Sequence, residues 1–478
     1  MFQLCILSLK PAVRVLGLEG PGPVFVEAPG VRRLRLAAPS QNQRDLLAGL
    51  IHGDRTADAL LRAPDASGAA LDSQYLLARL EKLGWLCYSL EWAKRPALTL
   101  EPLTADFQAP WTAPTGLFRL SRFAWLRRQE GGGILLENPL GFGRIRIHQP
   151  ALLGLVGLLG EPTDAPSLAL ALPGAGPDWS AACLALLLQS GAVGPCDADG
   201  KLREDRDPAL RQWEFHDLLF HSRSRLGRHD GPYGATLRFL GEIPPLPALK
   251  TPGAGPRTPL PEPAAGTAIT PFFQVLAERS SGRTPGKTPM TLRQLGEFLH
   301  QVARVRAFVP ANPADPGSYE RTRRPCASGG AMHSIELYLI VARCTGLEPG
   351  FYHYDPATHA LERLRDLDDE VRRFLAFGQA SMRADAPPDL LFTLAARFQR
   401  VAWKYQTMAY ATILKDTGAM FQQMYLVATA LGLAPCAIGC GDAWAFARVA
   451  GLDDLQETSV GEFALSASPG SPSGAPPR

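Results

Sequence analysis

An apolar stretch near the carboxyl end of the chain constrains the fold most strongly. Within residues 401–442, one set of apolar side chains recurs at i, i+4, i+7 and i+11: Met420, Met424, Val427 and Leu431. A second apolar stripe consists of Phe421, Tyr425 and Ala428. This pattern predicts a helix that is buried on both faces. Gly432 and Pro435 follow the stretch, and both residue types are typical of a helix end.

Two titratable residues, Lys404 and Tyr405, lie side by side just before this stretch. Most such residues near a core are structural, because Lys extends its ammonium group to solvent and Tyr packs its ring. A titratable pair at the edge of an apolar core is also typical of a chemical site. From residue type alone, both interpretations stay open.

The charge balance and the apolar runs exclude several classes of protein. The chain has 478 residues, enough for two to four domains, with 49 Lys plus Arg against 46 Asp plus Glu. A net charge of +3 does not indicate a nucleic-acid or acidic-membrane partner. Apolar runs such as residues 151–159 are shorter than the ~20 residues of a membrane span. The amino terminus lacks a secretion-signal pattern, so we expect a cytoplasmic protein.

Eight cysteines are scattered along the chain, and the closest pair is Cys436 and Cys440. Neither a C-x-x-C nor an H-x-x-x-H partner stands at metal-site spacing. We therefore expect reduced, mostly buried thiols and no metal site.

Residues 1–205 contain an apparent internal duplication. The alternating segment R-L-R-L at 33–36 recurs as R-I-R-I at 144–147, and each is followed by an apolar helical stretch. A further helix then ends at a glycine, Gly84 in the first copy and Gly191 in the second. Strand, helices, glycine and short strand form the layout of a winged-helix module, although leucine-rich helices also align by chance.

We expect two such modules, at residues 1–105 and 106–206. Winged helices often bind DNA, but the candidate recognition helix at 72–83 balances two acidic residues against two basic ones. It lacks the basic face that phosphate contacts require. The other use of this scaffold is to hold a peptide as an added strand at the sheet edge, which predicts a peptide partner and no nucleic acid.

A connector at residues 207–270 separates these modules from the second half. It begins with a predicted helix at 213–228 and continues into a Pro- and Gly-rich stretch at 242–268. Because neither helix nor central strand persists in such a composition, we interpret this stretch as the main linker. The Pro- and Gly-rich end of the chain, residues 466–478, is predicted to be disordered.

The second half contains two candidate ligand elements. In an extended segment Arg279, Ser281 and Arg283 point the same way, and two guanidinium groups around a hydroxyl form a plausible phosphate cradle. A Ser-Gly-Gly turn at 328–330 precedes a predicted strand at 335–342. Glycines there allow a flat ligand to approach the backbone, although they also simply make turns.

Several ordered motifs resemble the SagB-type dehydrogenases of the nitroreductase-like flavoprotein superfamily, the FMN-dependent azoline oxidases that include cyanobactin oxidases. The motifs are Pro325, the S-G-G-A run at 328–331, His333 with Glu336, the hairpin G-L-E-P-G-F-Y-H-Y-D-P and the helix end A-L-G-L. The resemblance is strong over residues 271–465 and extends more weakly to nearly the whole chain. It implies an α+β fold class, with a C-terminal nitroreductase-like FMN domain preceded by two winged-helix, peptide-clamp-like modules.

The resemblance assigns cofactor-binding roles to eight residues: Arg279, Ser281, Arg283, Ser328, Gly329, Gly330, Gln422 and Gly439. The first three match the R-x-S-x-(R/K) element that holds the FMN phosphate and ribityl chain. The next three match the turn against the isoalloxazine. Gln422 matches a helix glutamine near the cofactor, and Gly439 matches the glycine whose backbone approaches N5.

Lys404 and Tyr405 match the Lys-Tyr pair that azoline oxidases of this family need, which favours the catalytic interpretation. The implied function is FMN-dependent oxidation of thiazoline or oxazoline rings to thiazole or oxazole in a ribosomal precursor peptide. A homodimer and a possible cyclodehydratase partner are implied as well. One of the two residues would be the base, with proximity and burial expected to lower the pKa of Lys404 or to stabilise a Tyr405 phenolate.

The sequence departs from the family at Ala419, Gln423 and Ser334, where relatives often have His, Asn and Pro. No basic residue near the carboxyl end completes the phosphate site. Two alternatives remain: a small-molecule nitro or quinone reductase with the same FMN core, and a non-catalytic leader-peptide-binding protein.

Overall fold

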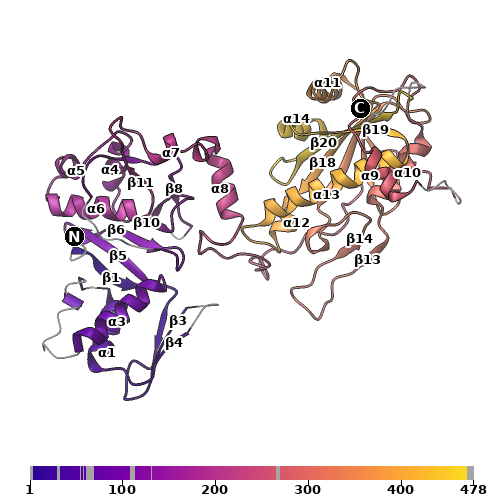
Figure 1. The fold of residues 1–478 in the computed structure, drawn as a ribbon. Coiled ribbons are helices and arrows are strands. Elements are labelled where there is room, and N and C mark those ends of the chain that lie inside the picture. The colour runs from indigo at the N-terminus through magenta and orange to yellow at the C-terminus, as the bar shows by residue number, and fades with distance from the viewer. Residues whose placement is uncertain are drawn as a thin grey trace. The chain divides into compact units, whose positions relative to one another are not determined.

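The computed structural model describes residues 4–28, 33–53, 55–56, 59–60, 69–107, 114–130, 132–264 and 270–470. The chain divides into two compact units, Met1–Gly231 and Pro232–Arg478, and each is described by itself (Figure 1). Within the described ranges, no helix is long and apolar enough to cross a membrane. Residues 471–478 of the predicted disordered tail lie outside the described residues.

The N-terminal unit combines antiparallel sheets with short helices. Its strands are β1 (Ile6–Leu9), β2 (Arg14–Leu16), β3 (Val24–Glu27), β4 (Arg33–Leu36), β5 (Leu86–Trp92), β6 (Arg95–Pro102), β7 (Phe118–Leu120), β8 (Trp125–Arg128), β9 (Ile134–Glu137), β10 (Gly143–Ile147) and β11 (Val193–Pro195). Its helices are α1 (Gln41–His52), α3 (Ala69–Lys82), α4 (Leu152–Leu158), α5 (Ala165–Ala171), α6 (Pro177–Gln189), α7 (Arg203–Arg206) and α8 (Phe215–Arg223), with a 3-10 turn at Leu210–Gln212.

The same order of elements occurs twice in this unit. Strands β2, β3 and β4 form an antiparallel meander, α1 and α3 follow, and β5 returns to pair with β1. Strands β8, β9 and β10 form a second meander, α4 to α6 follow, and β11 returns to pair with β7. The two copies share one sheet, whose described strands lie in the order β1-β5-β6-β10-β9-β8, because β6 pairs with both β5 and β10.

Local sequence explains where the first long helix begins and ends. The side chain of Ser40 accepts a hydrogen bond from the backbone N–H of Gln43, and the Gln43 side chain accepts one from the backbone N–H of Ser40. This reciprocal capping box fixes the start of α1. Gly53 ends it in the left-handed conformation, with φ of 64°.

The C-terminal unit is built on a larger antiparallel sheet. Its strands are β12 (Arg257–Pro259), β13 (Ala307–Val309), β14 (Arg321–Arg323), β15 (Ile335–Val341), β16 (Gly350–Asp355), β17 (Ala360–Asp366), β18 (Leu390–Arg397), β19 (Leu433–Ile438) and β20 (Glu457–Ala467). Its helices are α9 (Phe272–Glu278), α10 (Leu292–Ala303), α11 (Asp369–Met382), α12 (Phe398–Ala402), α13 (Ala409–Ala430) and α14 (Ala443–Ala450), with a 3-10 turn, η3, at Gly329–Ala331.

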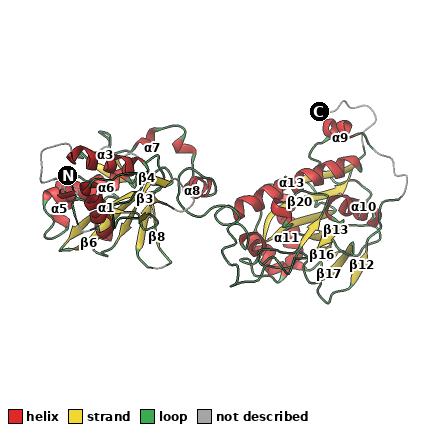
Figure 2. Cartoon of the chain, turned by 90° about the horizontal axis from the view of Figure 1, so that it is seen from below, coloured by secondary structure: helices red, strands yellow, loops and turns green. Residues whose placement is uncertain are grey.

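This sheet is covered on both faces, which explains why its central strands are apolar throughout. The described strands lie in the order β12-β17-β16-β15-β18-β20-β19. Alternate residues of β15 enter different cores: Leu337 and Leu339 pack with α10 and α13, whereas Tyr338 and Ile340 pack with α11 and α14. Figures 1 and 2 show α13 along one side of the sheet, and Figure 1 shows α11 and α14 on the other. The mixed α and β content agrees with the expected fold class.

The predicted main linker is wrong over residues 242–264. Its backbone carbonyls accept hydrogen bonds from side chains of the C-terminal unit: Trp403 Nε1 to Ile243 O at 2.7 Å, and Arg400 Nη1 to Leu246 O at 2.6 Å. Strand β12 also joins the sheet edge, where Pro259 is tolerated. Proline prevents a helix but leaves the carbonyls available as acceptors, so the stretch packs as irregular structure. Residues 265–269 lie outside the described residues.

Helix α13 ends where the sequence predicts, but it is not buried on both faces. Leu431 is its C-cap, and Gly432 follows with φ of 65°. Met420 and Met424 enter the core, whereas Gln422 is exposed and Leu414 is 38% exposed. The sheet covers only one side of the helix, so Phe421 and Tyr425 of the second apolar stripe are only half-buried in the single chain, whereas Ala428 is buried.

Candidate active site

The Ser-Gly-Gly turn is held by an acidic residue of α13. Ser328 Oγ donates a hydrogen bond to Asp416 Oδ2 at 2.6 Å, and the backbone N–H of Gly329 donates to Asp416 Oδ1 at 2.9 Å. Asp416 is 7% exposed. Burial raises the pKa of its carboxyl group, and the hydrogen bonds from Ser328 and Gly329 oppose that shift. The helix therefore positions the turn through one carboxylate.

Both glycines of the turn allow close approach of neighbouring side chains. A Cβ atom at Gly329 would lie 2.4 Å from Thr412 Cγ2 of α13. A Cβ atom at Gly330, whose φ is 62°, would lie 2.5 Å from the Tyr405 hydroxyl oxygen and 3.0 Å from Lys404 Nζ. The structure thus brings the predicted turn and the predicted Lys-Tyr pair together.

A third residue, Tyr319, completes this cluster. Lys404 Nζ donates a hydrogen bond to the Tyr319 hydroxyl oxygen at 2.6 Å, and the Tyr319 hydroxyl donates to Gly330 O at 3.0 Å. Lys404 Nζ also lies 5.0 Å from the ring centroid of Tyr405. Tyr319 is 9% exposed, so its polar end is aimed into the cluster. We call Lys404, Tyr405, Tyr319 and Gly330 the Lys-Tyr cluster.

The expected lowering of the Lys404 pKa is wrong. Burial acts to lower the pKa of Lys404, but the hydrogen bond and charge interaction with Tyr319, together with Tyr405, raise it above the ordinary value. The reason is that the two phenol oxygens stabilise the ammonium form more than partial burial disfavours it. Lys404 is therefore a cation at neutral pH, and it donates a hydrogen bond to Tyr319.

The predicted phosphate element lies along the carboxyl half of α13. Ser281 Oγ is 2.9 Å from the Tyr425 hydroxyl oxygen, and the Arg279 guanidinium lies 5.3 Å from the centroid of the same ring. Arg283 is exposed, and its charge lowers the pKa of Cys436, which burial raises overall. Over the described part of the chain, neither arginine forms an ion pair with an acidic side chain.

Gly439 opens onto a cavity of about 260 Å³. Its lining comprises Tyr410, Phe421, Ile438, Gly439, Cys440, Gly441, Ala443, Ser459, Val460, Gly461 and Glu462. Apart from Gly439 itself and its two chain neighbours, no atom of the described residues lies within 4 Å of the position that a Cβ of Gly439 would take. We call this cavity the Gly439 pocket. Gln422 follows the pocket residue Phe421 on α13, but it is exposed and does not line the Gly439 pocket.

Within a single chain, the predicted site residues do not form one site but lie in separate groups. The turn meets α13 at Thr412, and the phosphate element meets it at Tyr425. Those positions are thirteen residues apart in the helix, which corresponds to about 20 Å along the helix axis. The Lys-Tyr cluster and the phosphate element therefore lie toward opposite ends of α13.

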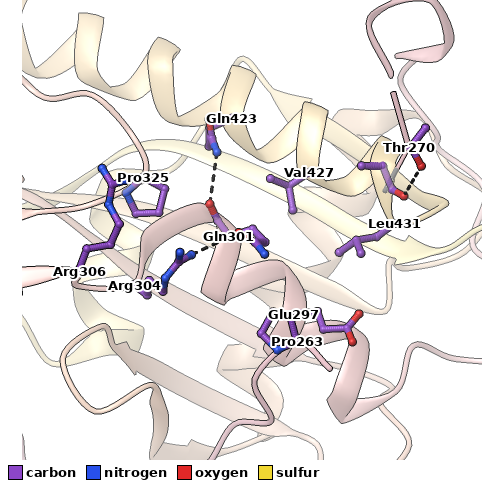
Figure 3. Close-up of a pocket in the computed structure, with 11 residues that line it drawn as sticks. Pro263, Thr270, Glu297, Gln301, Arg304, Arg306, Pro325, Gln423, Val427 and Leu431 are labelled. Atoms are coloured by element: carbon purple, nitrogen blue, oxygen red, sulfur yellow. Dashed lines mark hydrogen bonds between the residues drawn. The ribbon is translucent and has the colours of Figure 1, made fainter. Parts of the chain in front are cut away.

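A larger cavity of about 470 Å³ lies between α10 and α13 (Figure 3). Its lining comprises Pro263, Thr270, Glu297, Gln301, Arg304, Arg306, Pro325, Gln423, Val427, Ala430 and Leu431. Gln423 Nε2 donates to Gln301 O at 3.2 Å across it. None of the predicted site residues lines this cavity, so it is distinct from the Gly439 pocket and the Lys-Tyr cluster.

Two family models match different parts of the chain. Residues 276–465 match the nitroreductase family, and residues 118–230 match the cyanobactin oxidase ThcOx. The first match covers most of the C-terminal unit, including the Lys-Tyr cluster and the Gly439 pocket. The second lies within the N-terminal unit.

Individual relatives agree with these matches. The protein MJ1384 of Methanocaldococcus jannaschii, named as a nitroreductase, is 30% identical over 165 residues, which is 34% of this chain and 76% of that protein. The microcin B17-processing protein McbC of Escherichia coli is 30% identical over 152 residues, 31% of this chain and 51% of McbC. In the solved E. coli McbBCD complex with truncated pro-MccB17, a chain aligns at 24% identity with a TM-score of 0.31, covering 43% of this chain and 76% of that one. The chain thus spans about half the length of McbC.

Proposed function

The chain belongs to the nitroreductase family, and from this premise we propose that it is an FMN-dependent azoline dehydrogenase. It oxidises thiazoline or oxazoline rings to thiazole or oxazole in a ribosomal precursor peptide. The matches to the cyanobactin oxidase model and to a microcin-processing protein support this substrate class. The observation that carries the proposal is the convergence of Lys404, Tyr405 and Tyr319 on the Gly330 turn.

The residues present fit an FMN molecule. Arg279 and Arg283 have no acidic partner among the described residues and suit a phosphate group. Ser281 adds a hydroxyl beside them. The open space over Gly439 lets a flat ring approach the backbone. These residues, with the turn at 328–330 and Gln422, are proposed to hold the cofactor.

In the proposed reaction, residues of the Lys-Tyr cluster remove the proton from the azoline ring. FMN, when bound, supplies the acceptor for the hydride that one carbon of the azoline ring gives up as the neighbouring carbon loses a proton. Since Lys404 is cationic, we assign proton abstraction to the Tyr405 oxygen as a phenolate, which takes the ring proton and becomes a phenol. Lys404 positions the phenol oxygens and stabilises negative charge on them. Tyr319 fixes Lys404 by linking it to the backbone of Gly330.

The test is oxidation of an azoline-bearing peptide by the purified full-length chain. We expect a yellow protein that removes about two daltons from the peptide, one hydride and one proton per ring. Lys404→Ala and Tyr405→Phe should keep the yellow cofactor and lose this activity. Lys201→Ala, at an exposed position in the loop before α7, should keep both. Full activity in the two site variants contradicts the assignment. Rapid NAD(P)H oxidation without peptide would favour the small-molecule reductase instead.

We further propose that the N-terminal unit holds the leader of the precursor peptide, as two winged-helix modules at 1–105 and 106–206. The first copy has a suitable edge. Among the described strands β4 pairs only with β3, whereas the corresponding β10 is covered by β9 on one edge and β6 on the other. A peptide can therefore add as a strand beside β4 but not beside β10. Arg33 and Arg35 are exposed on β4 and favour an acidic peptide.

Hydrogen exchange tests this clamp. When a precursor peptide with its leader is added, the backbone amides of residues 33–36 should exchange more slowly, because new strand pairing protects them. The amides of residues 144–147 should not change, since both edges of β10 are already paired. Unchanged exchange at 33–36 under saturating peptide contradicts a clamp at β4.

A homodimer and a cyclodehydratase partner complete the proposal. Helix α13 leaves Tyr410 and Leu414 42% and 38% exposed, and α9 leaves Phe273 82% exposed. Partly uncovered apolar helices of this kind suit a contact with a second copy. We place the reaction in the cytoplasm, where its peptide substrate is made.

A further inference from the structure

Glu462 is a buried carboxyl group that the reaction described above does not use. It lies in β20, is 1% exposed and lines the Gly439 pocket. Ser459 Oγ donates a hydrogen bond to its Oε1 atom. Its Oε2 atom is buried and has no hydrogen-bond partner among the described residues. A buried polar atom without a partner is costly in a folded protein, so this oxygen requires an explanation.

The loop that follows β19 is shaped around this carboxyl group. A Cβ atom at Gly441 would lie 2.3 Å from Glu462 Oε2 and 2.8 Å from Oε1. Any side chain at position 441 would therefore displace the carboxyl group or the loop. By contrast, the space over Gly439, two residues earlier, is open. The backbone thus closes over Glu462 at one glycine and leaves the pocket accessible at the other.

No cation faces Glu462 from the described elements packed against it. Strand β18 places Thr393 opposite it, and strand β19 places Ile438 there. Among the residues that the structure describes, the charge that acts on Glu462 is the Asp442 carboxylate, at the start of α14. The other titratable groups of the pocket are Tyr410 of α13 and Cys440 of the loop. These surroundings favour the neutral acid over the carboxylate.

The protonation state follows from these surroundings. Burial raises the pKa of Glu462 to about 7, Asp442 acts in the same direction, and the hydrogen bond from Ser459 opposes both. Below neutral pH the group is a carboxylic acid. Since Oε1 accepts a hydrogen bond from Ser459, the proton resides on Oε2, the oxygen without a partner. A neutral acid with a free O–H is a hydrogen-bond donor.

We propose that Glu462, as a neutral acid, donates a hydrogen bond from Oε2 to an acceptor atom of the ring system bound in the Gly439 pocket. This inference rests on the proposed function, in which that ring is the isoalloxazine of FMN, whose carbonyl oxygens and ring nitrogens are acceptors. Glu462 is then a binding residue whose contribution depends on pH. When it ionises, the donor is lost and a negative charge faces the acceptor atoms.

FMN affinity as a function of pH tests the inference. Apoprotein is titrated with FMN between about pH 6 and pH 9, and binding is followed by quenching of flavin fluorescence. The wild-type affinity should fall by up to about tenfold per pH unit above about pH 7, since one proton is needed for binding. Glu462→Gln keeps a donor at every pH, so its affinity should stay flat across this range. Glu462→Ala should bind weakly throughout.

Two further variants test whether the effect on FMN affinity is specific to the Glu462 carboxyl group. Glu348→Gln makes the same chemical change at an exposed position and should follow the wild-type profile. Gly441→Ala displaces the carboxyl group and should weaken binding at pH 6. If wild type and Glu462→Gln show the same pH dependence, or Glu462→Ala binds like wild type at pH 6, the inference is overturned while the flavoenzyme assignment stands. If the wild type binds no FMN at any pH, both fall.

Discussion

The hydrogen bond between Lys404 and Tyr319 sets the charge of the Lys-Tyr cluster. The Lys404 ammonium group lies 2.6 Å from the Tyr319 hydroxyl oxygen, and this hydroxyl in turn donates a hydrogen bond to the backbone carbonyl of Gly330. Removing the Tyr319 hydroxyl would free Lys404 to move and would take away part of what raises its pKa. Tyr319 is therefore a positioning residue for the pair.

Tyr319→Phe should retain flavin but lower kcat by roughly tenfold to a hundredfold, a loss at or below the low end of that expected for a group that itself transfers the proton. Its loss of activity at alkaline pH should also begin at a lower pH, because Lys404 loses its proton more easily without Tyr319. Steady-state rates on an azoline peptide across pH measure both effects. Tyr352→Phe is a matched control, since that hydroxyl also donates to a backbone carbonyl, at 2.7 Å, but meets no lysine. An unchanged alkaline limb in Tyr319→Phe would contradict the role.

Glu462 should also make stability depend on pH. Its folded-state pKa of about 7 exceeds the ordinary value of 4.5, so the folded state binds more protons than the unfolded state between these values. The free energy of unfolding should therefore fall as pH rises from 4.5 to 7. A difference of 7 minus 4.5 pKa units corresponds to about 3 kcal/mol.

Urea unfolding of the apoprotein at several pH values measures this slope. Asp416, whose pKa burial also raises, contributes in the same direction. The difference between wild type and Glu462→Gln isolates Glu462, because the amide does not titrate. Parallel curves for the two proteins would show that folding does not raise the pKa of Glu462.

The site residues that could not be predicted from the sequence are those whose hydrogen-bond partners lie far away along the chain. Tyr319 meets Lys404 across 85 positions, and Asp416 meets Ser328 across 88. No local spacing links such pairs before the chain folds. The adjacent Lys404 and Tyr405 were visible because they stand together at the edge of an apolar stretch.

At the scale of elements, α13 organises the candidate site. Its first half carries Thr412 and Asp416 against the turn, and its second half carries Tyr425 against the phosphate element. The turn between α13 and the Lys-Tyr pair depends on a glycine with φ of 62° at position 330. An L-residue there combines backbone strain with a collision.

Gly330→Ala should therefore displace Tyr405 and Lys404 and abolish most of the azoline oxidation. The left-handed backbone adds a stability loss of about 1 kcal/mol or more. Activity and urea unfolding of the same preparation measure the two effects. Gly154→Ala is the control, because Gly154 is exposed within α4 and its Cβ would meet no atom within 4 Å. That change should stabilise the helix slightly, and wild-type activity in Gly330→Ala would contradict the site geometry.

The hydrophobic repeat in the sequence predicts the type and the end of helix α13, but it does not predict how the helix packs. The repeat of Met420 and Met424 marks α13, and Gly432 marks its end. The same repeat suggested burial on both faces, because hydrophobicity does not reveal whether a neighbour exists in the same chain. The prediction of a linker at 242–264 is wrong for a related reason: the tertiary hydrogen bonds of this stretch come from Trp403 and Arg400, far along the sequence.

At the scale of the whole molecule, the chain has two units with separate cores. One core comprises residues of the N-terminal unit, and two others flank the sheet of the C-terminal unit. The proposed function assigns peptide binding to the N-terminal unit and oxidation to the C-terminal unit. The sequence repeat predicts the repeated order of elements in the N-terminal unit. It does not predict that the two copies share one sheet, because strand pairing between copies leaves no periodic signal in the sequence.

The proposed dimer makes a stringent prediction for the intact protein. The phosphate element and the Lys-Tyr cluster lie toward opposite ends of α13, and the proposed function requires both at one FMN molecule. We therefore expect each active site to take Arg279 from one subunit and Lys404 from the other. Arg279→Ala and Lys404→Ala homodimers should each be nearly inactive.

Mixing the two variants under conditions that exchange subunits should restore activity. Half of the dimers become heterodimers, and in each of these one site carries both substitutions while the other carries neither. Activity should rise to about a quarter of the wild-type value. Mixing either variant with itself supplies the control. If both residues of a site come from one subunit, every site in the heterodimer retains one substitution and no activity returns, so the outcome decides how the site is assembled.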